Sequence, residues 1–205
     1  TIVPVGGAGH RVDVLIPTRN RPRLTVEAID AVRAQTFTDW HLWVVDDASD
    51  DDTPTHLARH VAGDPRVTIL HRTEHGGANP ARQTALDASG APLVATCDSD
   101  DWWEPRKLEL QLADMRARDL SISYTSYVRV GEDGRRLSEV RPPPRVGYAD
   151  MLRSNHIGNL TGMYDRRLGD ARFRKVGHED YVFWLELVRR AGGAARVPSD
   201  GPLAS

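Results

Sequence analysis

The sequence predicts an α/β fold with a mostly parallel central sheet flanked by helices. From residue 11 to about residue 120, short apolar runs alternate with segments whose apolar residues recur at helical spacing. This alternation is typical of βαβ units, whose right-handed crossovers place successive strands parallel in one sheet. The chain has 205 residues, of which 40% are hydrophobic and 27% charged, as in an ordinary globular domain. Disordered, collagen-like and coiled-coil chains are therefore excluded.

Four strand–helix pairs are predicted in the first half of the chain. Pro22 and Pro105 each mark a helix start, because proline is well tolerated in the first helical turn. After Pro105, the residues Leu108, Leu112 and Met115 recur at helical spacing and predict one buried face. The predicted strands are 12–16, 42–45, 67–70 and 92–97, and the predicted helices are 22–32, 53–61, 79–88 and one that begins at 105.

The second half predicts a more mixed arrangement, with a soft boundary near residue 120. Alternating apolar residues over 122–130 predict one half-buried strand, and Asp133 and Gly134 predict a turn after it. The three prolines within 141–145 predict a stiff connector. A short helix at 148–152, a strand at 160–164 and a helix at 179–190 complete the prediction.

Composition excludes several classes of partner and location. Cys97 is the only cysteine, so an intrachain disulfide is excluded. No apolar run is long enough to span a membrane, and residues 1–10 have the features of a flexible lead-in rather than of a signal peptide. The formal net charge of −2 gives no basic surface for nucleic acid. We therefore expect a cytoplasmic protein without a membrane span or a nucleic-acid partner.

Polar residues follow the first two predicted strands, at the sheet edge where ligands bind in open parallel sheets. Thr18 and Asn20 follow the first strand, after Pro17, which we expect to end it. Asp46 and Asp47 come directly off the second strand, where a carboxylate can accept from a nucleobase N–H or a ribose hydroxyl. The alternative for both loops is structural, with their polar groups capping turns and the following helix.

A glycine pair precedes the third predicted helix. Gly76 and Gly77 allow a close approach of the backbone, and Arg82 lies in the first turns of the helix. A helix N-terminus attracts phosphate through its free N–H groups, and arginine adds charge-assisted hydrogen bonds. The spacing is not that of a P-loop, and a simple glycine turn before a helix is the alternative.

The sharpest local signal follows the fourth predicted strand, where the sequence reads CDSDDWWEP. In an extended segment, Asp98 and Asp100 would share one side with Ser99 between them, because side chains alternate. Paired carboxylates suit a hard divalent cation that is shared with substrate phosphates. Trp102 and Trp103 follow at once and suit either the C–H face of a sugar or packing in the core.

The last signal opens the helix predicted at 179–190. Glu179 and Asp180 stand in its first turn, which the helix dipole alone would favour. The functional alternative makes Asp180 a general base toward a hydroxyl group. His178, Glu179 and Trp184 are then candidate contacts to an acceptor, and no histidine spacing predicts a zinc site.

Four stretches in this order resemble glycosyltransferase family 2: VLIPTRNR, WVVDDASDDDT, GGANPARQTALDASGAPLVATCDSDDWWEPRKLE and HEDYVFWLELVRRAG. The resemblance covers roughly residues 11–192, and IGNLTGMYDRR is also similar to short bacterial members that build surface polysaccharides. It implies the GT-A fold, a Rossmann-like sheet with a mixed acceptor-side half. In this interpretation 1–10 is a lead-in, 11–120 a half that binds a nucleotide sugar, and 121–205 the acceptor half of the same domain.

The resemblance also implies a role for individual residues on the donor side. The donor would be a nucleotide sugar, most often a UDP-sugar. Pro17, Thr18 and Asp47 match the positions that surround the base, with Asp47 accepting from uracil N3–H. Arg82 matches an arginine near the nucleotide, and Asp98 matches a contact to ribose.

The same resemblance implies an inverting, metal-dependent transfer to a hydroxyl acceptor. Asp100 would bind Mg²⁺ or Mn²⁺ on the diphosphate, and Asp180 would be the catalytic base. A lipid-linked acceptor would bring the protein to the inner membrane face. The other candidate contacts are Asn20, Asp46, Gly77 and Ser99 for the donor, and Trp102, Trp103, His178, Glu179 and Trp184 for the acceptor.

The sequence departs from the family pattern at several positions and leaves two other functions open. Arg19 replaces a frequent aromatic residue, and His75 and Gln83 each replace a frequent asparagine. The sequence also stops soon after the last predicted helix, where family members usually continue. A sugar nucleotidyltransferase would carry a glycine-rich loop after the first strand, where this sequence has PTRNR. A non-catalytic module that binds nucleotide sugars or glycans would have no need of the full set of acidic positions.

Overall fold

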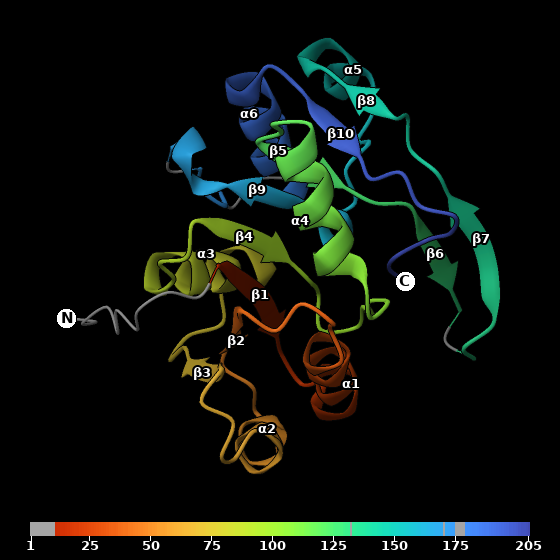
Figure 1. The fold of residues 1–205 in the computed structure, drawn as a ribbon. Helices are drawn as coiled ribbons and strands as arrows, with labels where there is room; N and C mark the ends of the chain where they lie inside the picture. Colours follow the sequence, from red (N-terminus) through yellow and green to blue (C-terminus); the bar gives the residue numbers. More distant parts are fainter. Residues whose placement is uncertain (1–10, 132, 170, 175–178) are drawn as a thin grey trace.

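The computed structural model describes residues 11–131, 133–169, 171–174 and 179–205 (Figure 1). Its main sheet has eight strands in the order β3-β2-β1-β4-β9-β5-β10-β8, and β6 and β7 form a separate two-stranded sheet. The strands are β1 Val12–Thr18, β2 Trp40–Asp46, β3 Val67–His71, β4 Leu93–Thr96, β5 Ile122–Tyr124, β6 Tyr127–Val130, β7 Arg136–Val140, β8 Arg145–Val146, β9 Met163–Asp165 and β10 Ala194–Arg196. The helices are α1 Pro22–Arg33, α2 Thr53–His60, α3 Ala78–Ala88, α4 Lys107–Ala117, α5 Tyr148–Arg153 and α6 Glu179–Ala191, with 3₁₀ turns η1 Asn159–Thr161 and η2 Arg166–Leu168.

The sheet is parallel in its first half and mixed in its second half, as the sequence predicts. Strands β3, β2, β1 and β4 run parallel. Strand β9 is inserted antiparallel between β4 and β5, so that one continuous sheet joins the two halves of the chain. Strand β10 runs parallel to β5, and β8 closes the sheet antiparallel to β10.

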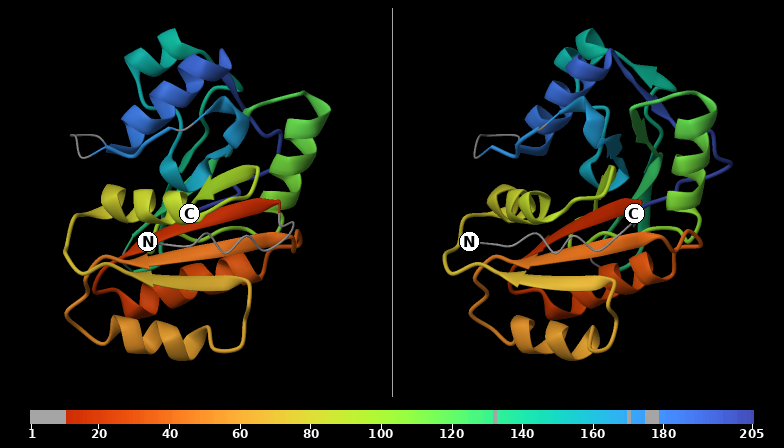
Figure 2. Two further views of the ribbon diagram at one scale, coloured as in Figure 1. Left: turned by 90° about the vertical axis from the view of Figure 1, so that its left-hand side faces the viewer. Right: turned by 60° about the vertical axis from the view of Figure 1, so that its left-hand side comes forward.

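Helices cover both faces of the sheet and bury two apolar cores. Alternate side chains of β1 divide between the faces, as the pleat requires: Val14 and Ile16 pack with α1, α2 and α4, whereas Leu15 packs with α3, α5 and α6. Figure 2 shows α1 and α2 on one side of the parallel strands and α3 on the other. The predicted buried face of α4, formed by Leu108, Leu112 and Met115, is confirmed.

Strand β1 continues through Pro17 to Thr18, so the prediction that Pro17 ends it is wrong. The reason is the short neighbour on one side: β4 pairs with β1 only as far as Leu15 and Thr96. The nitrogen of Pro17 faces β4, beyond the last residue of β4 that pairs with β1. Its missing N–H therefore costs no hydrogen bond of the sheet. Thr18 then pairs with Asp46 on the other side.

Three further predictions are corrected in the second half and on the first helix. The single strand predicted at 122–130 is two strands in different sheets, β5 and β6. The strand predicted at 160–164 is the 3₁₀ turn η1 followed by β9, and the sequence did not predict β7 or β10. Leu24, which shares helical spacing with the buried Ala28, Ile29 and Val32 and so fits the pattern of a buried face on α1, is exposed.

The C-terminal residues bring the small sheet and the end of β4 together. Ala204 forms isolated bridges with Trp103 and with Tyr127. The backbones of Trp102 and Ser205 exchange two hydrogen bonds. In the part of the chain that the structure describes, no helix is long and apolar enough to cross a bilayer.

Candidate functional site

The loops after β1 and β2 are tied to each other at the carboxyl edge of the sheet. The Asp47 amide donates to the Thr18 carbonyl at 2.9 Å. Asn20 has a left-handed backbone, with φ of 52°, a conformation that asparagine tolerates better than most residues. Its Nδ2 donates to Asp50 Oδ1 at 2.6 Å, and its Oδ1 accepts from the Asp50 amide at 3.1 Å. The side chain of Asn20 therefore holds the loops after β1 and β2 together, and both its amide oxygen and its amide nitrogen are used in hydrogen bonds within the protein.

Asp46 and Asp47 are both buried at the end of β2 and make different contacts. Asp46 accepts from the amide and hydroxyl of Ser49 and lies 3.3 Å from His71 Nδ1, so it closes its own loop. Asp47 holds the loop that precedes α3. Its carboxylate accepts from the Gly77 amide at 2.6 Å and from the Gly76 amide at 3.1 Å.

Two side chains complete the surroundings of Asp47. His75 Nδ1 lies 2.8 Å from its Oδ2, and Arg72 Nε lies 2.7 Å from its Oδ1. Burial would raise the pKa of Asp47, but the amides of Gly77 and Gly76, with His75 and Arg72, outweigh burial and hold the pKa below its usual value. A carboxylate with these partners has little capacity left for a nucleobase N–H. The structure therefore places Asp47 as the anchor of the glycine loop, which the sequence did not predict.

Gly77 and Arg82 lie where α3 begins. Gly77 has φ of 97°, a conformation that glycine adopts without strain, and it precedes the first residue of the helix. Arg82 is buried, and its guanidinium is shared between Asn79 Oδ1, at 2.9 Å, and Asp98 Oδ1. Arg82 thus reaches the end of β4 from α3.

The residues after β4 form a turn, so the expectation of an extended segment is wrong. The Asp101 amide donates to the Asp98 carbonyl, and the Asp98 amide donates back to Asp101 Oδ2 at 3.0 Å. Asp98 and Asp100 therefore do not share a side through strand alternation. Burial, together with the nearby charge of Asp98, raises the pKa of Asp101 to about 8.

The two remaining carboxylates of the turn differ in how free they are. Asp98 Oδ1 accepts from Arg82 and from Asn159 Nδ2, the latter at 3.0 Å. Asp100 is about half exposed, and its Oδ2 lies 2.6 Å from Arg21 NH1. Asp100 is thus more exposed to a ligand than Asp98, whose side chain is 29% exposed.

Asn159 connects the turn after β4 to α6. Its Nδ2 donates to Asp98, and its Oδ1 accepts from Trp184 Nε1 at 3.4 Å. On the other side of Arg82, Asn79 Nδ2 donates to the Arg174 carbonyl at 2.9 Å. A polar chain therefore runs from α3 through Asp98 to α6, and neither asparagine was predicted to take part.

Asp180 stands one turn before Trp184 on α6, so both lie on the same face of the helix. It is half-buried. Among the described residues, no hydrogen bond or ion pair engages its carboxylate. The aspartate therefore lies on the helix face that Asn159 joins to Asp98.

The predicted acceptor contacts fare differently. Trp102 is 44% exposed beside the turn and can meet a ligand. Trp103 and Trp184 are fully buried, with the Trp103 indole donating to the Leu160 carbonyl, so their interpretation as acceptor contacts is replaced by one as core residues. His178 lies outside the described residues, and Glu179 is described only as the first residue of α6.

A cavity of about 200 Å³ joins the ends of three strands. Its lining comes from the loop after β1, the end of β2, the start of α3 and the turn after β4: Pro17, Thr18, Arg19, Arg21, Asp47, Ala78 and Ser99. Four of the residues predicted to contact a donor therefore meet at one cavity.

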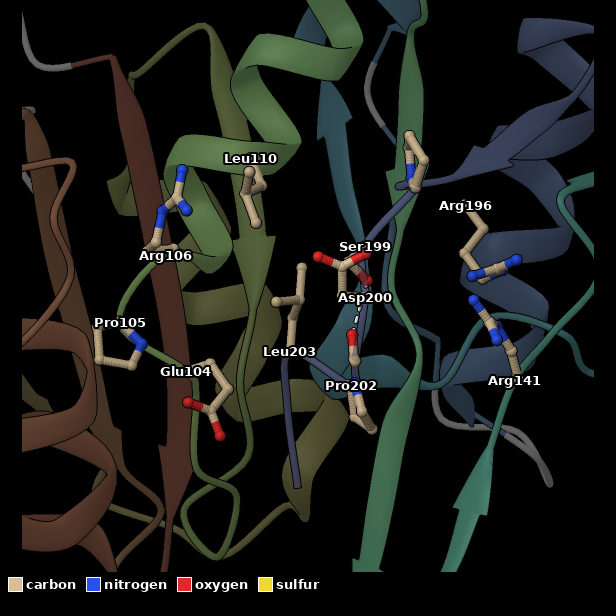
Figure 3. A pocket seen from close by; sticks show the side chains of 12 residues that line it. Glu104, Pro105, Arg106, Leu110, Arg141, Arg196, Ser199, Asp200, Pro202 and Leu203 are labelled. Atoms are coloured by element: carbon tan, nitrogen blue, oxygen red, sulfur yellow. Dashed lines mark hydrogen bonds between the residues drawn. The ribbon is translucent and has the colours of Figure 1, made fainter.

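A larger cavity, of about 810 Å³, opens beside α4 and the C-terminal segment (Figure 3). Arg141 and Arg196 project into it from one side, and Glu104 and Arg106 come from the start of α4. None of its lining residues is a predicted donor contact. Cavity volume alone therefore does not select a candidate site. The smaller cavity at the strand ends is the one lined by residues that were predicted to contact a donor.

The carboxylates near this cavity suit a divalent cation that is shared with a substrate. Among the described residues, no three His, Cys, Asp or Glu side chains come together to hold a metal ion alone. Mg²⁺ commonly uses one or two carboxylates and completes its shell with water and phosphate oxygens. The half-exposed carboxylate of Asp100, beside a cavity that borders Ser99, is such a partial site.

Comparison with known proteins gives a family and a fold. The model of Glycosyl transferase family 2 matches residues 13–183. A Bacillus subtilis protein named "Putative teichuronic acid biosynthesis glycosyltransferase TuaG" is 32% identical over 182 residues, which cover 87% of this chain and 72% of that protein. An Escherichia coli protein, "UDP-Glc:alpha-D-GlcNAc-diphosphoundecaprenol beta-1,3-glucosyltransferase WfgD", is 31% identical over 181 residues, covering 88% and 70%.

Solved structures show the same architecture at lower identity. The crystal structure of S. aureus TarS 1–349 in complex with UDP has a TM-score of 0.79 at 19% identity and covers 94% of this chain and 59% of that one. The mannosyltransferase PcManGT from Pyrobaculum calidifontis, in complex with GDP-Man and Mn²⁺, has a TM-score of 0.72 at 22% identity and covers 93% and 55%. These neighbours are GT-A glycosyltransferases, so the predicted GT-A fold is confirmed.

Proposed function

Because the chain belongs to glycosyltransferase family 2, we propose that it transfers a sugar from a nucleoside diphosphate donor to a hydroxyl group, with inversion at the anomeric carbon. The observation that carries this proposal is the convergence of strand-end residues on one cavity, one of whose lining residues, Arg21, contacts the half-exposed carboxylate of Asp100. Ligands of open parallel sheets bind at this edge.

The donor nucleotide would lie along the carboxyl ends of β1 and β2. Pro17 and Thr18 would contact the base, and Asp47 would hold the Gly76–Gly77 loop against it. Asp98, held by Arg82, would accept from the ribose hydroxyls. This revises the expected contact between Asp47 and uracil N3–H to an indirect one, since the Asp47 oxygens are already engaged.

Asp100 would hold a divalent cation, Mg²⁺ or Mn²⁺, which when bound stabilises negative charge on the departing diphosphate. The neighbour that binds Mn²⁺ with GDP-Man supports this part of the proposal. Arg82 lies within one hydrogen bond of the same turn and adds positive charge on the donor side.

Asp180 would remove the proton from the acceptor hydroxyl. Among the described residues, no hydrogen bond or ion pair engages its carboxylate, and it lies on the face of α6 that Trp184 shares. A base on the face opposite the leaving group gives a single displacement with inversion, and no covalent intermediate is needed. A half-exposed carboxylate can serve as base once it reaches the hydroxyl in the bound complex.

Relatives narrow the classes of substrate that we propose. The name of WfgD specifies UDP-Glc as donor and an N-acetylglucosamine linked to diphosphoundecaprenol as acceptor, and TarS binds UDP-GlcNAc. We therefore propose a UDP-sugar as donor and a saccharide hydroxyl on a lipid-linked diphosphate as acceptor, within polysaccharide synthesis. A peripheral position at the inner membrane face would follow from such an acceptor.

The test is a transfer assay with a panel of UDP- and GDP-sugars and Mn²⁺, using Asp180→Asn and a matched control. Asp119→Asn is the control, because Asp119 is exposed, has the left-handed φ of 49° that asparagine tolerates, and borders a cavity at the opposite edge of the sheet. We expect Asp180→Asn to lose at least about a hundredfold in kcat with donor binding nearly unchanged. Transfer by Asp180→Asn at the parent rate would remove Asp180 as the base. Donor binding by the parent without turnover on any acceptor would favour a non-catalytic binding module.

A further inference from the structure

An ion pair covers the more exposed of the two ion-paired carboxylates in the turn after β4. Arg21 NH1 lies 2.6 Å from Asp100 Oδ2, and the two residues come from loops 79 positions apart in the chain. Asp98 is engaged by Arg82 and Asn159, and Asp101 accepts from the Asp98 amide within the turn. Among the described residues, Arg21 is the ion-pair partner of Asp100.

The stability of the fold does not explain this pair. Both side chains are about half exposed, at 48% and 47%, and exposed ion pairs contribute at most about 1 kcal/mol. Helix α1 begins with Pro22 and is closed by the Thr25 amide, which donates to the Arg21 carbonyl at 3.0 Å. The backbone carbonyl of Arg21 thus forms part of the first turn of α1, and this helical role does not involve the guanidinium group.

The side chain of Arg21 also borders the small cavity at the strand ends. It shares this lining with Thr18 and Ser99, which the proposed function places beside a donor. A guanidinium is always charged, and its planar N–H groups match the oxygens of a phosphate. Arg21 can therefore reach two opposite partners, a carboxylate at the cation position and a diphosphate in the cavity.

We propose that Arg21 is a placeholder for the cation in the empty site and a ligand of the donor diphosphate in the filled one. This inference rests on the proposed function. Without a cation, Arg21 balances the charge of Asp100. A divalent cation on Asp100 repels the guanidinium and removes its partner, while the diphosphate supplies new anionic oxygens within the same cavity. Arg21 thus exchanges its partner when cation and nucleotide bind together, and it favours that joint binding over binding of the cation alone.

The experiment compares Arg21→Gln with Arg23→Gln, a control that removes an equal charge from an exposed position in the first turn of the same helix. The first measurement is the Kd of Mn²⁺ alone, by electron paramagnetic resonance of the free ion. Because Arg21 no longer competes, we expect Mn²⁺ to bind Arg21→Gln about two- to fivefold more tightly. Arg23→Gln should match the parent. Equal Mn²⁺ affinity in all three proteins would overturn the placeholder role.

The second measurement is the Kd of UDP at saturating Mn²⁺, by calorimetry. We expect UDP to bind Arg21→Gln about tenfold more weakly, since a charge-assisted hydrogen bond to phosphate is lost. Unchanged UDP affinity would overturn the phosphate role. Circular dichroism and the thermal midpoint of each variant establish that it is folded.

Failure of the inference can be told apart from failure of the proposed function. If the parent binds neither Mn²⁺ nor UDP- or GDP-nucleotides, the proposed function fails and the inference fails with it. If the parent binds both and Arg21→Gln behaves as Arg23→Gln, the inference alone is wrong. Asp100→Asn should lose Mn²⁺ binding in the presence and in the absence of Arg21.

Discussion

Replacement of Gly162 by alanine tests the contact that fixes α6 against the sheet. Gly162 follows η1 with φ of −79° and ψ of 142°, which any residue can adopt, so backbone conformation gives no reason for glycine here. Space does. A Cβ at this position would lie 2.1 Å from Cζ2, 2.3 Å from Cη2 and 2.8 Å from Cε2 of Trp184.

The size of the effect follows from those distances. Real Cβ contacts stay beyond 3.0 Å, so the Trp184 ring must retreat by at least 0.9 Å from the closest of the three. The ring is fully buried and packs edge-on against Tyr164 and Phe183, which leaves no free direction. Overpacking of this kind costs about 1–3 kcal/mol. For a chain of this length, that corresponds to a fall in Tm of about 2–12 °C.

The assay is thermal and urea unfolding of Gly162→Ala beside Gly90→Ala. A Cβ on Gly90 would meet no atom within 4 Å, so this control should unfold as the parent does. Trp184→Phe removes part of the obstructing ring, so the double variant should be less destabilised than the two single changes added together. If Gly162→Ala unfolds at the parent midpoint, or if the two changes simply add, the packing argument is refuted.

The remaining predictions concern buried polar groups. Burial lowers the pKa of Lys107 to about 7, so the unfolded state binds more protons than the folded state between about pH 7 and 10.5. The contribution of Lys107 to the free energy of unfolding therefore rises with pH across that range and is lost as pH falls through 7. In urea titrations at several pH values, Lys107→Met should lack this rise. A pH dependence of stability that is the same in Lys107→Met and in the parent would contradict the prediction. Asn159→Ala leaves Trp184 Nε1 without its acceptor and Asp98 without one donor, at a cost of about 1–3 kcal/mol and with a raised KM for the donor. Asn155→Ala, at an exposed position, loses the hydrogen bond from the Ile157 amide and should leave the KM for the donor unchanged.

The first half of the fold could be predicted because each of its strands and helices has a clear pattern in its own short stretch of sequence. Strands β1 to β4 are short apolar runs, and α1 and α4 open near prolines that suit a first helical turn. The boundary errors were local too. Pro17 continues β1 because the neighbouring strand is short, and no pattern within β1 itself carries that fact.

The second half resisted prediction because alternation does not say which sheet a strand joins. Ile122 and Tyr124 pair with β9 or β10, whereas Val128 pairs with β7, yet all of them fit one alternating pattern. Strand β10 has only three residues and is defined by its neighbours β5 and β8. Such strands follow from tertiary pairing, and period alone does not predict them.

The location of the candidate site followed from the sequence, whereas its internal contacts did not. Polar residues after parallel strands predict a shared edge, and Thr18, Asp47 and Ser99 do border one cavity. The partners of each carboxylate come from distant positions, such as Asn159 for Asp98, 61 residues away. The burial of Asp47 under its glycine loop was equally unreadable, since it depends on the path of a turn that only the folded chain fixes.

The insertion of β9 between β4 and β5 has a consequence for any attempt to divide this protein. A fragment that stops near residue 120 would keep β1 to β4 but strip the outer side of β4 of its pairing partner. Such an open edge recruits other strands, so the fragment should self-associate rather than stay a monomer. Chimaeras that exchange the region after residue 120 with a relative would therefore need to include β9, because β9 pairs with the outer side of β4.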